Sequence, residues 1–202
     1  MFDLNGKVAV VTGGETGIGL AISRNLAVAG VKTVIGGIQP EAGAKAVAEI
    51  QELGGEVLFV RTDVRAKEQV EALVKTAVDK YGQLDIIVNN AGVFDGFADI
   101  METTEELWDQ ITSINLKGTF FGCQAALEHM IPRGVGRVIN TSSIGGLVGR
   151  ADGASYTASK FAVIGLTRQM ATTHSGSGIT FNTVCPGLIA TDIRGNSASI
   201  LP

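Results

Sequence analysis

A tyrosine and a lysine four residues apart, Tyr156 and Lys160, are the side chains of this sequence best suited to moving a proton. Within a helix, that spacing places both on one face, one turn apart. A phenol ionises at about pH 10, but a neighbouring ammonium group favours the phenolate and lowers the pKa. We therefore expect Lys160 to make Tyr156 a usable general acid or base.

A hydroxyl group that could hold a substrate oxygen beside Tyr156 is found at Ser143. This serine ends a run from Val138 that is apolar at first and then rich in hydroxyl groups. Such a run is typical of a buried strand whose carboxyl end opens on a pocket. A tyrosine and a lysine at this spacing also occur together by chance, so the interpretation needs support from other motifs.

A glycine-rich turn follows directly after the apolar run Val8–Thr12 and precedes a helical pattern. In a dinucleotide-binding turn, Gly13 would permit the sharp bend and Gly17 would let backbone N–H groups approach a pyrophosphate. Gly19 would let the helix pack closely on the sheet, and the positive end of the helix dipole would attract phosphate. A purely structural turn could show the same glycines, so motifs elsewhere in the chain are needed to distinguish it from a dinucleotide-binding turn.

Short runs rich in valine and isoleucine alternate with longer amphipathic stretches. This alternation predicts an α/β fold, a doubly wound parallel sheet with helices on both faces. Ligands on such sheets bind beyond the carboxyl ends of the strands, where all the residues named above lie. The expected strands are Val8–Thr12, Thr33–Ile35, Val57–Arg61, Ile86–Asn89, Arg137–Thr141 and Thr180–Val184, and the expected helices end at Ala29 or span Ala42–Leu53, Lys67–Tyr81, Glu105–Met130 and Tyr156–Thr173.

The composition is that of an ordinary globular chain, with 202 residues, 45% of them hydrophobic and 18% charged, and we expect one domain. A net charge of −4 without any basic cluster argues against nucleic acid or an acidic membrane as a partner. Cys123 and Cys185 lack metal-type spacing, so we expect free thiols in a reducing cytosol and no metal site. Residues 1–30 show no leader-like pattern, and a cytoplasmic location is therefore expected.

Several short motifs occur in a fixed order along the chain: TGxxxGxG at Thr12–Gly19, NNAG at Asn89–Gly92, Asn115, Ser143, YxxxK at Tyr156–Lys160, and PG at Pro186–Gly187. In order and spacing they resemble the short-chain dehydrogenase/reductase family, in its shorter branch of about 250 residues. The resemblance extends over essentially the whole chain. It implies a single Rossmann-type domain over residues 1–202 and an NAD(P)-dependent oxidoreductase that interconverts a secondary alcohol and a ketone.

The resemblance also implies a role for each matching residue. Among the catalytic residues, Tyr156 exchanges a proton with the substrate oxygen and Ser143 orients that oxygen. Lys160 also binds the ribose, and Asn115 supports a proton relay through water. On the residues alone, however, Asn115 could instead bond locally within a helix.

The same resemblance implies where the cofactor lies. Asp63 and Val64 meet adenine, although Asp63 could also be a solvated carboxylate at the end of a strand. Asn90 and Gly92 flank the nicotinamide-side ribose, and the nicotinamide amide is held by the pair Ile189 and Thr191. The implied cofactor-binding residues are Gly13, Glu15, Thr16, Gly17, Ile18, Gly19, Asp63, Val64, Asn90, Ala91, Gly92, Tyr156, Lys160, Pro186, Gly187, Ile189 and Thr191.

The end of the second expected strand departs from the dinucleotide-binding pattern. Such folds usually carry an acid there for the ribose diol of NAD, or a basic residue for the 2′-phosphate of NADP. Residues 36–39 are Gly-Gly-Ile-Gln instead, and Thr16 replaces another frequent basic position. Glu15 in the turn would repel a 2′-phosphate, so we expect NAD to be preferred over NADP. If NADP is preferred, Gln39 becomes the candidate phosphate contact.

Family members that resemble this chain usually continue for about 50 residues past Pro202, through another helix and a seventh strand. The resemblance therefore implies that this sequence lacks elements that normally cover the substrate and build an oligomer interface. We expect a homo-oligomer, either a dimer or a homotetramer. The expected partner is a small-molecule alcohol or ketone.

Three other hypotheses remain open on the sequence. A non-catalytic dinucleotide-binding regulator would keep the glycine turn, but it would not need Ser143, Tyr156 and Lys160. A 3-oxoacyl reductase of the same family would use these residues on a particular ketone. An epimerase or dehydratase would oxidise its substrate only transiently, without a net change in NADH.

Overall fold

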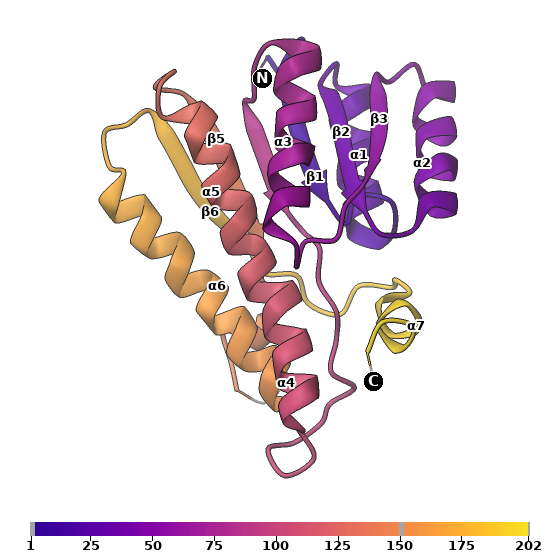
Figure 1. Cartoon of the computed structure of the whole chain (residues 1–202), viewed down its shortest axis with the longest axis vertical. Helices are drawn as coiled ribbons and strands as arrows, with labels where there is room; N and C mark the ends of the chain where they lie inside the picture. The colour runs from indigo at the N-terminus through magenta and orange to yellow at the C-terminus, as the bar shows by residue number, and fades with distance from the viewer. Residues whose placement is uncertain (1–2, 150–151, 202) are drawn as a thin grey trace.

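The chain forms a six-stranded parallel sheet with helices on both faces, in a computed structural model that describes residues 3–149 and 152–201 (Figure 1). The strands lie in the order β3-β2-β1-β4-β5-β6. They are β1 (Val8–Thr12), β2 (Lys32–Gly37), β3 (Val57–Arg61), β4 (Ile86–Asn89), β5 (Gly136–Thr141) and β6 (Ile179–Val184). The α-helices are α1 (Gly17–Val28), α2 (Pro40–Glu52), α3 (Lys67–Tyr81), α4 (Glu105–Thr112), α5 (Gly118–Met130), α6 (Ala154–Thr173) and α7 (Ile193–Ala198).

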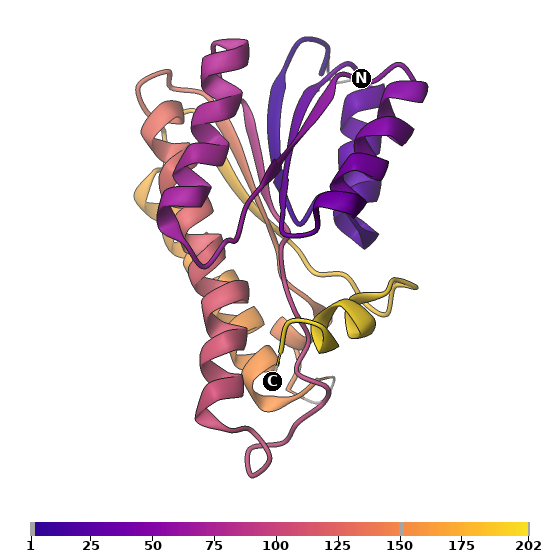
Figure 2. The ribbon, with the colours of Figure 1, turned by 45° about the vertical axis from the view of Figure 1, so that its right-hand side comes forward.

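Strands β1 and β4 are buried along their whole length because successive side chains enter cores on opposite faces of the sheet. In β1, Val8 and Val10 belong to the core shared with α3, α5 and α6, whereas Ala9 and Val11 belong to the core shared with α1. Figure 2 shows α1 and α2 together on one side of the sheet and α3, α5 and α6 on the other. The predicted doubly wound α/β fold is thus confirmed.

Several element boundaries differ from the prediction by one or two residues, and three differences bear on the site. Strand β2 extends to Gly37 because Gly36 and Gly37 remain in register with β3. The stretch predicted as one helix over residues 105–130 is divided by a π-helical turn at Ser113–Lys117. Helix α6 begins at Ala154, two residues before Tyr156.

The strand order reverses between β1 and β4, which are neighbours in the sheet. The segments that leave these two strands therefore turn to opposite sides and open a crevice at their carboxyl ends. The glycine turn follows β1 and the NNAG segment follows β4, so both motifs meet at this crevice.

Two further observations apply to the described residues. None of the helices there is both long enough and apolar enough to cross a membrane. Within the same ranges, no group of three or more His, Cys, Asp and Glu side chains is arranged to hold a metal ion.

Candidate active site

The turn after β1 depends on glycine at several positions. Gly13 and Gly17 have positive φ angles of 60° and 52°, a conformation that glycine adopts at little cost. A Cβ atom on Gly19 would overlap the carbonyl oxygen of Gly13, so α1 can start this close to the turn only with glycine there. The free backbone N–H groups of the first turn of α1 therefore lie at the crevice, where an anionic group is stabilised.

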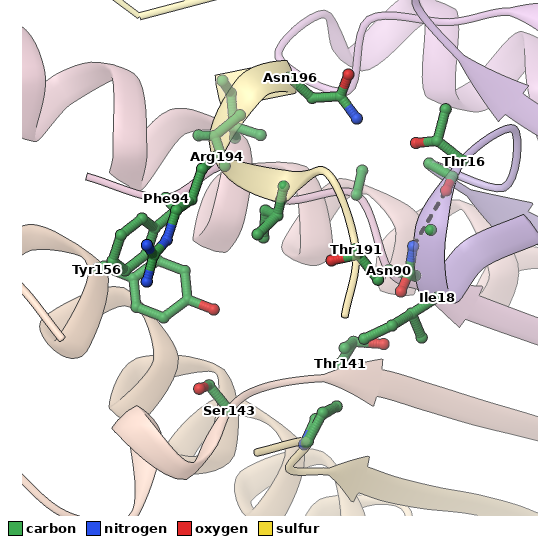
Figure 3. Close-up of a pocket in the computed structure, with 18 of the residues that line it drawn as sticks. Thr16, Ile18, Asn90, Phe94, Thr141, Ser143, Tyr156, Thr191, Arg194 and Asn196 are labelled. Carbon is green, nitrogen blue, oxygen red and sulfur yellow. Dashed lines mark hydrogen bonds between the residues drawn. The ribbon is translucent and has the colours of Figure 1, made fainter. Parts of the chain in front are cut away.

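The loop after β4 is tied directly to the glycine turn. The hydroxyl oxygen of Thr12 accepts hydrogen bonds from the backbone N–H groups of Asn90 (3.0 Å) and Ala91 (3.1 Å). The Asn90 side-chain amide donates to the carbonyl oxygen of Gly13 (3.1 Å), and Asn90 lies near Thr16 and Ile18 in Figure 3. These bonds hold the two motifs of the crevice in a fixed relation.

Ser143, Tyr156 and Lys160 come together beyond the carboxyl end of β5. The hydroxyl oxygen of Ser143 accepts a hydrogen bond from the Gly145 N–H (3.1 Å), and Figure 3 shows Ser143 and Tyr156 on the same cavity. Lys160 Nζ donates to the carbonyl oxygen of Thr141 (3.0 Å) and lies 5.4 Å from the centre of the Tyr156 ring. Tyr156 and Lys160 are both buried.

Burial controls the protonation of the tyrosine and the lysine. It raises the pKa of Tyr156 to about 12; the Ser143 hydroxyl opposes that shift, while Asp152 and Asp95 add to it. Burial also lowers the pKa of Lys160 to about 8. The prediction that Lys160 lowers the pKa of Tyr156 is therefore wrong for this site, because loss of water disfavours the charged forms of both groups.

Asn115 lies in the π-helical turn and is almost completely buried. Its side-chain oxygen accepts from the Val93 N–H (2.8 Å), and its amide donates to the Val93 carbonyl (2.9 Å) and to the Ser159 hydroxyl (3.3 Å). Asn115 thus connects the loop after β4 with α6, the helix that carries Tyr156 and Lys160. A uniform helix was predicted here, and the π-helical turn had no recognisable signal in the sequence.

A cavity of about 510 Å³ runs along the carboxyl ends of the strands. Most of the residues predicted to bind cofactor or act on substrate line it, whereas Glu15, Gly19 and Asn115 do not. Those that do are Gly13, Thr16, Gly17, Ile18, Asp63, Val64, Asn90, Ala91, Gly92, Ser143, Tyr156, Lys160, Pro186, Gly187, Ile189 and Thr191.

At the end of β3, Asp63 lies on the cavity but is already paired. The guanidinium group of Arg65 donates to both carboxylate oxygens of Asp63, with distances of 2.6 to 3.0 Å. This pairing lowers the pKa of Asp63. Arg65 was not predicted as a site residue, although its position two residues after a strand-end acid could have suggested the pair.

Helix α7 closes one end of the cavity and was not predicted, because six residues are too few for a clear hydrophobic period. The Ser197 hydroxyl oxygen accepts from the Phe94 N–H (2.8 Å). The guanidinium group of Arg194 lies 5.1 Å from the Phe97 ring and 6.0 Å from the Phe94 ring. The Phe94 ring in turn packs edge-on against the Tyr156 ring, with centroids 5.2 Å apart (Figure 3). Arg194 and Phe97 are therefore cavity residues that sequence reasoning missed.

Thr191, just before α7, lies against the glycine turn. Its side chain would be 3.4 Å from a Cβ atom on Gly17. The family resemblance implies that Thr191 meets the nicotinamide amide, and in the structure Thr191 also lies beside Gly17 of the glycine turn.

Residues 7–200 match the family model described as short chain dehydrogenase. Among curated proteins, the 3beta-hydroxysteroid dehydrogenase 2 of Eggerthella lenta is 40% identical over 191 residues, which cover 94% of this chain and 74% of that protein. A short-chain dehydrogenase/reductase from Burkholderia phymatum, solved in complex with NAD, superposes with a TM-score of 0.94 at 31% identity, covering 100% of this chain and 72% of that one. A variant of the actinorhodin polyketide ketoreductase, solved with NADPH, has a TM-score of 0.89 at 37% identity, covering 99% and 76%.

The chain belongs to the short-chain dehydrogenase family. It is an oxidoreductase of the kind that interconverts an alcohol and a ketone with a nicotinamide cofactor, NAD or NADP. The predicted family and enzyme class are thus confirmed, and the hypothesis of a non-catalytic regulator is not favoured.

Proposed function

We propose that Tyr156 and Ser143 act on the substrate oxygen, that Lys160 supports Tyr156, and that Asn115 keeps the elements that carry them in position. The observation that carries this proposal is the placement of the Tyr156 and Ser143 hydroxyl groups on one cavity, with Lys160 Nζ 5.4 Å from the tyrosine ring. A buried hydroxyl pair with a titrating amine behind it suits proton transfer to or from an alcohol oxygen.

The crevice fits a dinucleotide. A Cβ atom on Gly13 would lie 2.9 Å from Ala91 Cα, so glycine at this position lets the turn after β1 pack directly against the loop after β4. The backbone N–H groups around Gly17 and the start of α1 would hold the pyrophosphate. When bound, the nicotinamide supplies or accepts the hydride, and the residues of the chain handle the accompanying proton.

The protonation states of Tyr156 and Lys160 favour ketone reduction at neutral pH. With a pKa of about 12, Tyr156 carries the proton that it donates to the ketone oxygen. Ser143 donates a hydrogen bond to the same oxygen and fixes its direction. Lys160, with a pKa lowered to about 8, titrates close to neutral pH one helical turn away and is placed to restore the proton of Tyr156. In alcohol oxidation, Tyr156 must accept the proton, so that direction requires the phenolate.

We infer that NAD is preferred over NADP. Relatives solved with NAD and with NADPH both resemble this chain, so the preference has to come from the chain's own residues. Residues 36–39 include no arginine or lysine, and Glu15 stands in the turn. A 2′-phosphate would meet a carboxylate there without a cationic partner.

We also propose a homo-oligomer, a dimer or a tetramer, in the cytoplasm. The support for assembly is a set of exposed aromatic side chains on neighbouring helices: Trp108 on α4, Phe120 on α5 and Phe161 on α6. The support for a cytoplasmic location is that Cys123 and Cys185 are both free thiols.

Replacement of Tyr156 by phenylalanine tests the proposed mechanism. The Tyr156→Phe variant should lose about 10²- to 10⁴-fold in kcat, the usual effect of deleting a general acid or base. Its Kd for NADH, measured from nicotinamide fluorescence, should stay within about twofold because the lost oxygen faces the substrate. The matched control is Tyr81→Phe, which alters the only other tyrosine, at the end of α3 and away from the cavity. Unchanged turnover in Tyr156→Phe would remove this residue from the mechanism.

A further inference from the structure

The carboxyl end of β2 lacks the acidic side chain that usually contacts the adenosine ribose in this fold. The strand ends at Gly37, which is buried and whose backbone lines the cavity. Residues 36–39 themselves carry no acidic or basic side chain that would distinguish a ribose hydroxyl from a 2′-phosphate.

The structure supplies a carboxylate at this position from another element. A Cβ atom built on Gly37 would overlap the carboxyl group of Glu15, meeting both its oxygens and its carboxyl carbon. Because an aspartate at position 37 would put its side chain into that same space, the Glu15 carboxyl group stands where that aspartate would begin. Glu15 Oε1 accepts a hydrogen bond from the Ile38 N–H (3.1 Å), which holds the carboxyl group at the end of β2.

The Glu15 carboxyl group retains bonding capacity. The residue is 5% exposed, and its Oε2 atom is buried without a hydrogen-bond partner among the described residues. Burial raises the pKa of Glu15, while the backbone N–H groups around it oppose the shift. A buried carboxylate oxygen without a donor is costly, so a ligand hydroxyl that reaches it would be favoured. Glu15 itself does not line the cavity, and a ribose would approach it along the backbone of Gly37 and Ile38, which does.

The basic residues that line the cavity do not offset this carboxylate. Arg65 is bound by both oxygens of Asp63. Lys160 bonds to Thr141 beside Tyr156, and Arg194 lies over the Phe94 and Phe97 rings. The end of β2 therefore presents one carboxylate whose neighbouring cations are engaged elsewhere.

We propose that Glu15, seated in the space that Gly37 leaves free, is the residue that makes this site favour the ribose hydroxyls of NAD over the 2′-phosphate of NADP. This inference rests on the proposed dinucleotide function and assigns its specificity to one pair of positions. The two residues form a unit, because a side chain at position 37 and the Glu15 carboxyl group exclude each other. A hydroxyl can donate to a carboxylate, whereas a phosphate carries negative charge and is repelled by it.

Because Glu15 and a side chain at position 37 would occupy the same space, the effects of substitutions at the two positions should not be additive. Gly37→Asp alone should weaken NADH binding, because two carboxyl groups would compete for one space and their charges repel. Glu15→Ala alone should reduce the discrimination between the cofactors. The double variant Glu15→Ala/Gly37→Asp should recover NADH preference, since the aspartate then occupies the vacated space. Independent sites would instead give additive effects.

The test measures binding rather than turnover. Titrations with NADH and NADPH follow nicotinamide fluorescence, and calorimetry with 5′-AMP and 2′,5′-ADP isolates the adenosine ribose. The protein should bind NADH at least about 10-fold more tightly than NADPH, and Glu15→Gln should reduce that ratio by about 10-fold or more. The 5′-AMP to 2′,5′-ADP ratio should change in parallel. Glu41→Gln, which removes an exposed charge at the start of α2, is the matched control and should leave both ratios unchanged.

The outcomes separate the two proposals. If the protein binds neither NADH nor NADPH, the proposed dinucleotide function itself fails. If it binds NADH with preference but Glu15→Gln, folded as judged by circular dichroism, keeps the same ratio, only the assignment to Glu15 fails. Tighter binding of NADPH than NADH by the unaltered protein would also overturn the assignment.

Discussion

The protonation of Tyr156 offers a direct check on the balance between burial and charge in this site. The chain has two tyrosines, and burial raises the pKa of each to about 12. A Tyr81→Phe variant leaves Tyr156 as the only phenol. With a pKa of about 12, about 1% of Tyr156 would be phenolate at pH 10, where an exposed tyrosine is about half ionised.

The assay is ultraviolet difference spectroscopy of Tyr81→Phe without cofactor, following phenolate absorbance from pH 6 to 10.5. We expect almost no phenolate signal until the top of this range, with circular dichroism confirming that the fold persists. In the Tyr81→Phe/Lys160→Met variant, the signal should stay equally low, because Lys160 does not determine the pKa of Tyr156. A midpoint near pH 8 that disappears in the Lys160→Met background would instead show that the ammonium group of Lys160 outweighs burial in setting the pKa of Tyr156.

Two further predictions concern the framework of the site. Gly19→Ala should weaken NADH binding by about 10-fold or more and lower Tm, because the added methyl group would overlap the Gly13 carbonyl oxygen. The control is Gly165→Ala in α6, where a Cβ atom has open space. Equal NADH affinity and equal Tm in the two variants would contradict this explanation. Asp85→Ala should lower the free energy of unfolding by about 3 kcal/mol in urea titrations, because the buried Asp85 carboxylate accepts from Arg133 and from the Val8 N–H. Asp79→Ala, which breaks an exposed ion pair with Lys75, should cost much less.

Strands β1, β2 and β4 were predictable because they are short, rich in valine and isoleucine and buried along almost their whole length. Strands β5 and β6 alternate buried residues with more exposed ones, which is the other pattern typical of a strand. The crossover helices were predictable because their apolar residues recur with the helical period. Interruptions within a helix leave no such trace, and the π-helical turn at Ser113–Lys117 therefore went unrecognised. Helix α7 was missed because it is too short for a period.

The candidate site was predictable as far as it depends on spacing along the chain. Tyr156 and Lys160 share a helical face, and the glycines of the turn follow β1 directly. The pKa of Tyr156 was wrong from sequence because burial is a property of the packed structure. The contact between Glu15 and Gly37 was also invisible, since it joins residues that approach each other only when β1 and β2 pair.

Isotope labelling can follow the hydride from the nicotinamide to the substrate carbon while Tyr156 supplies the proton. The protein is incubated with NADH carrying deuterium at C4 of the nicotinamide and with a panel of steroid, cyclic and 3-oxoacyl ketones, and the alcohol products are analysed by mass spectrometry. The account predicts deuterium on the carbinol carbon from one face of the cofactor, with turnover lost in Tyr156→Phe. Reduction of no ketone with either NADH or NADPH, or a carbinol hydrogen that comes from solvent, would contradict it.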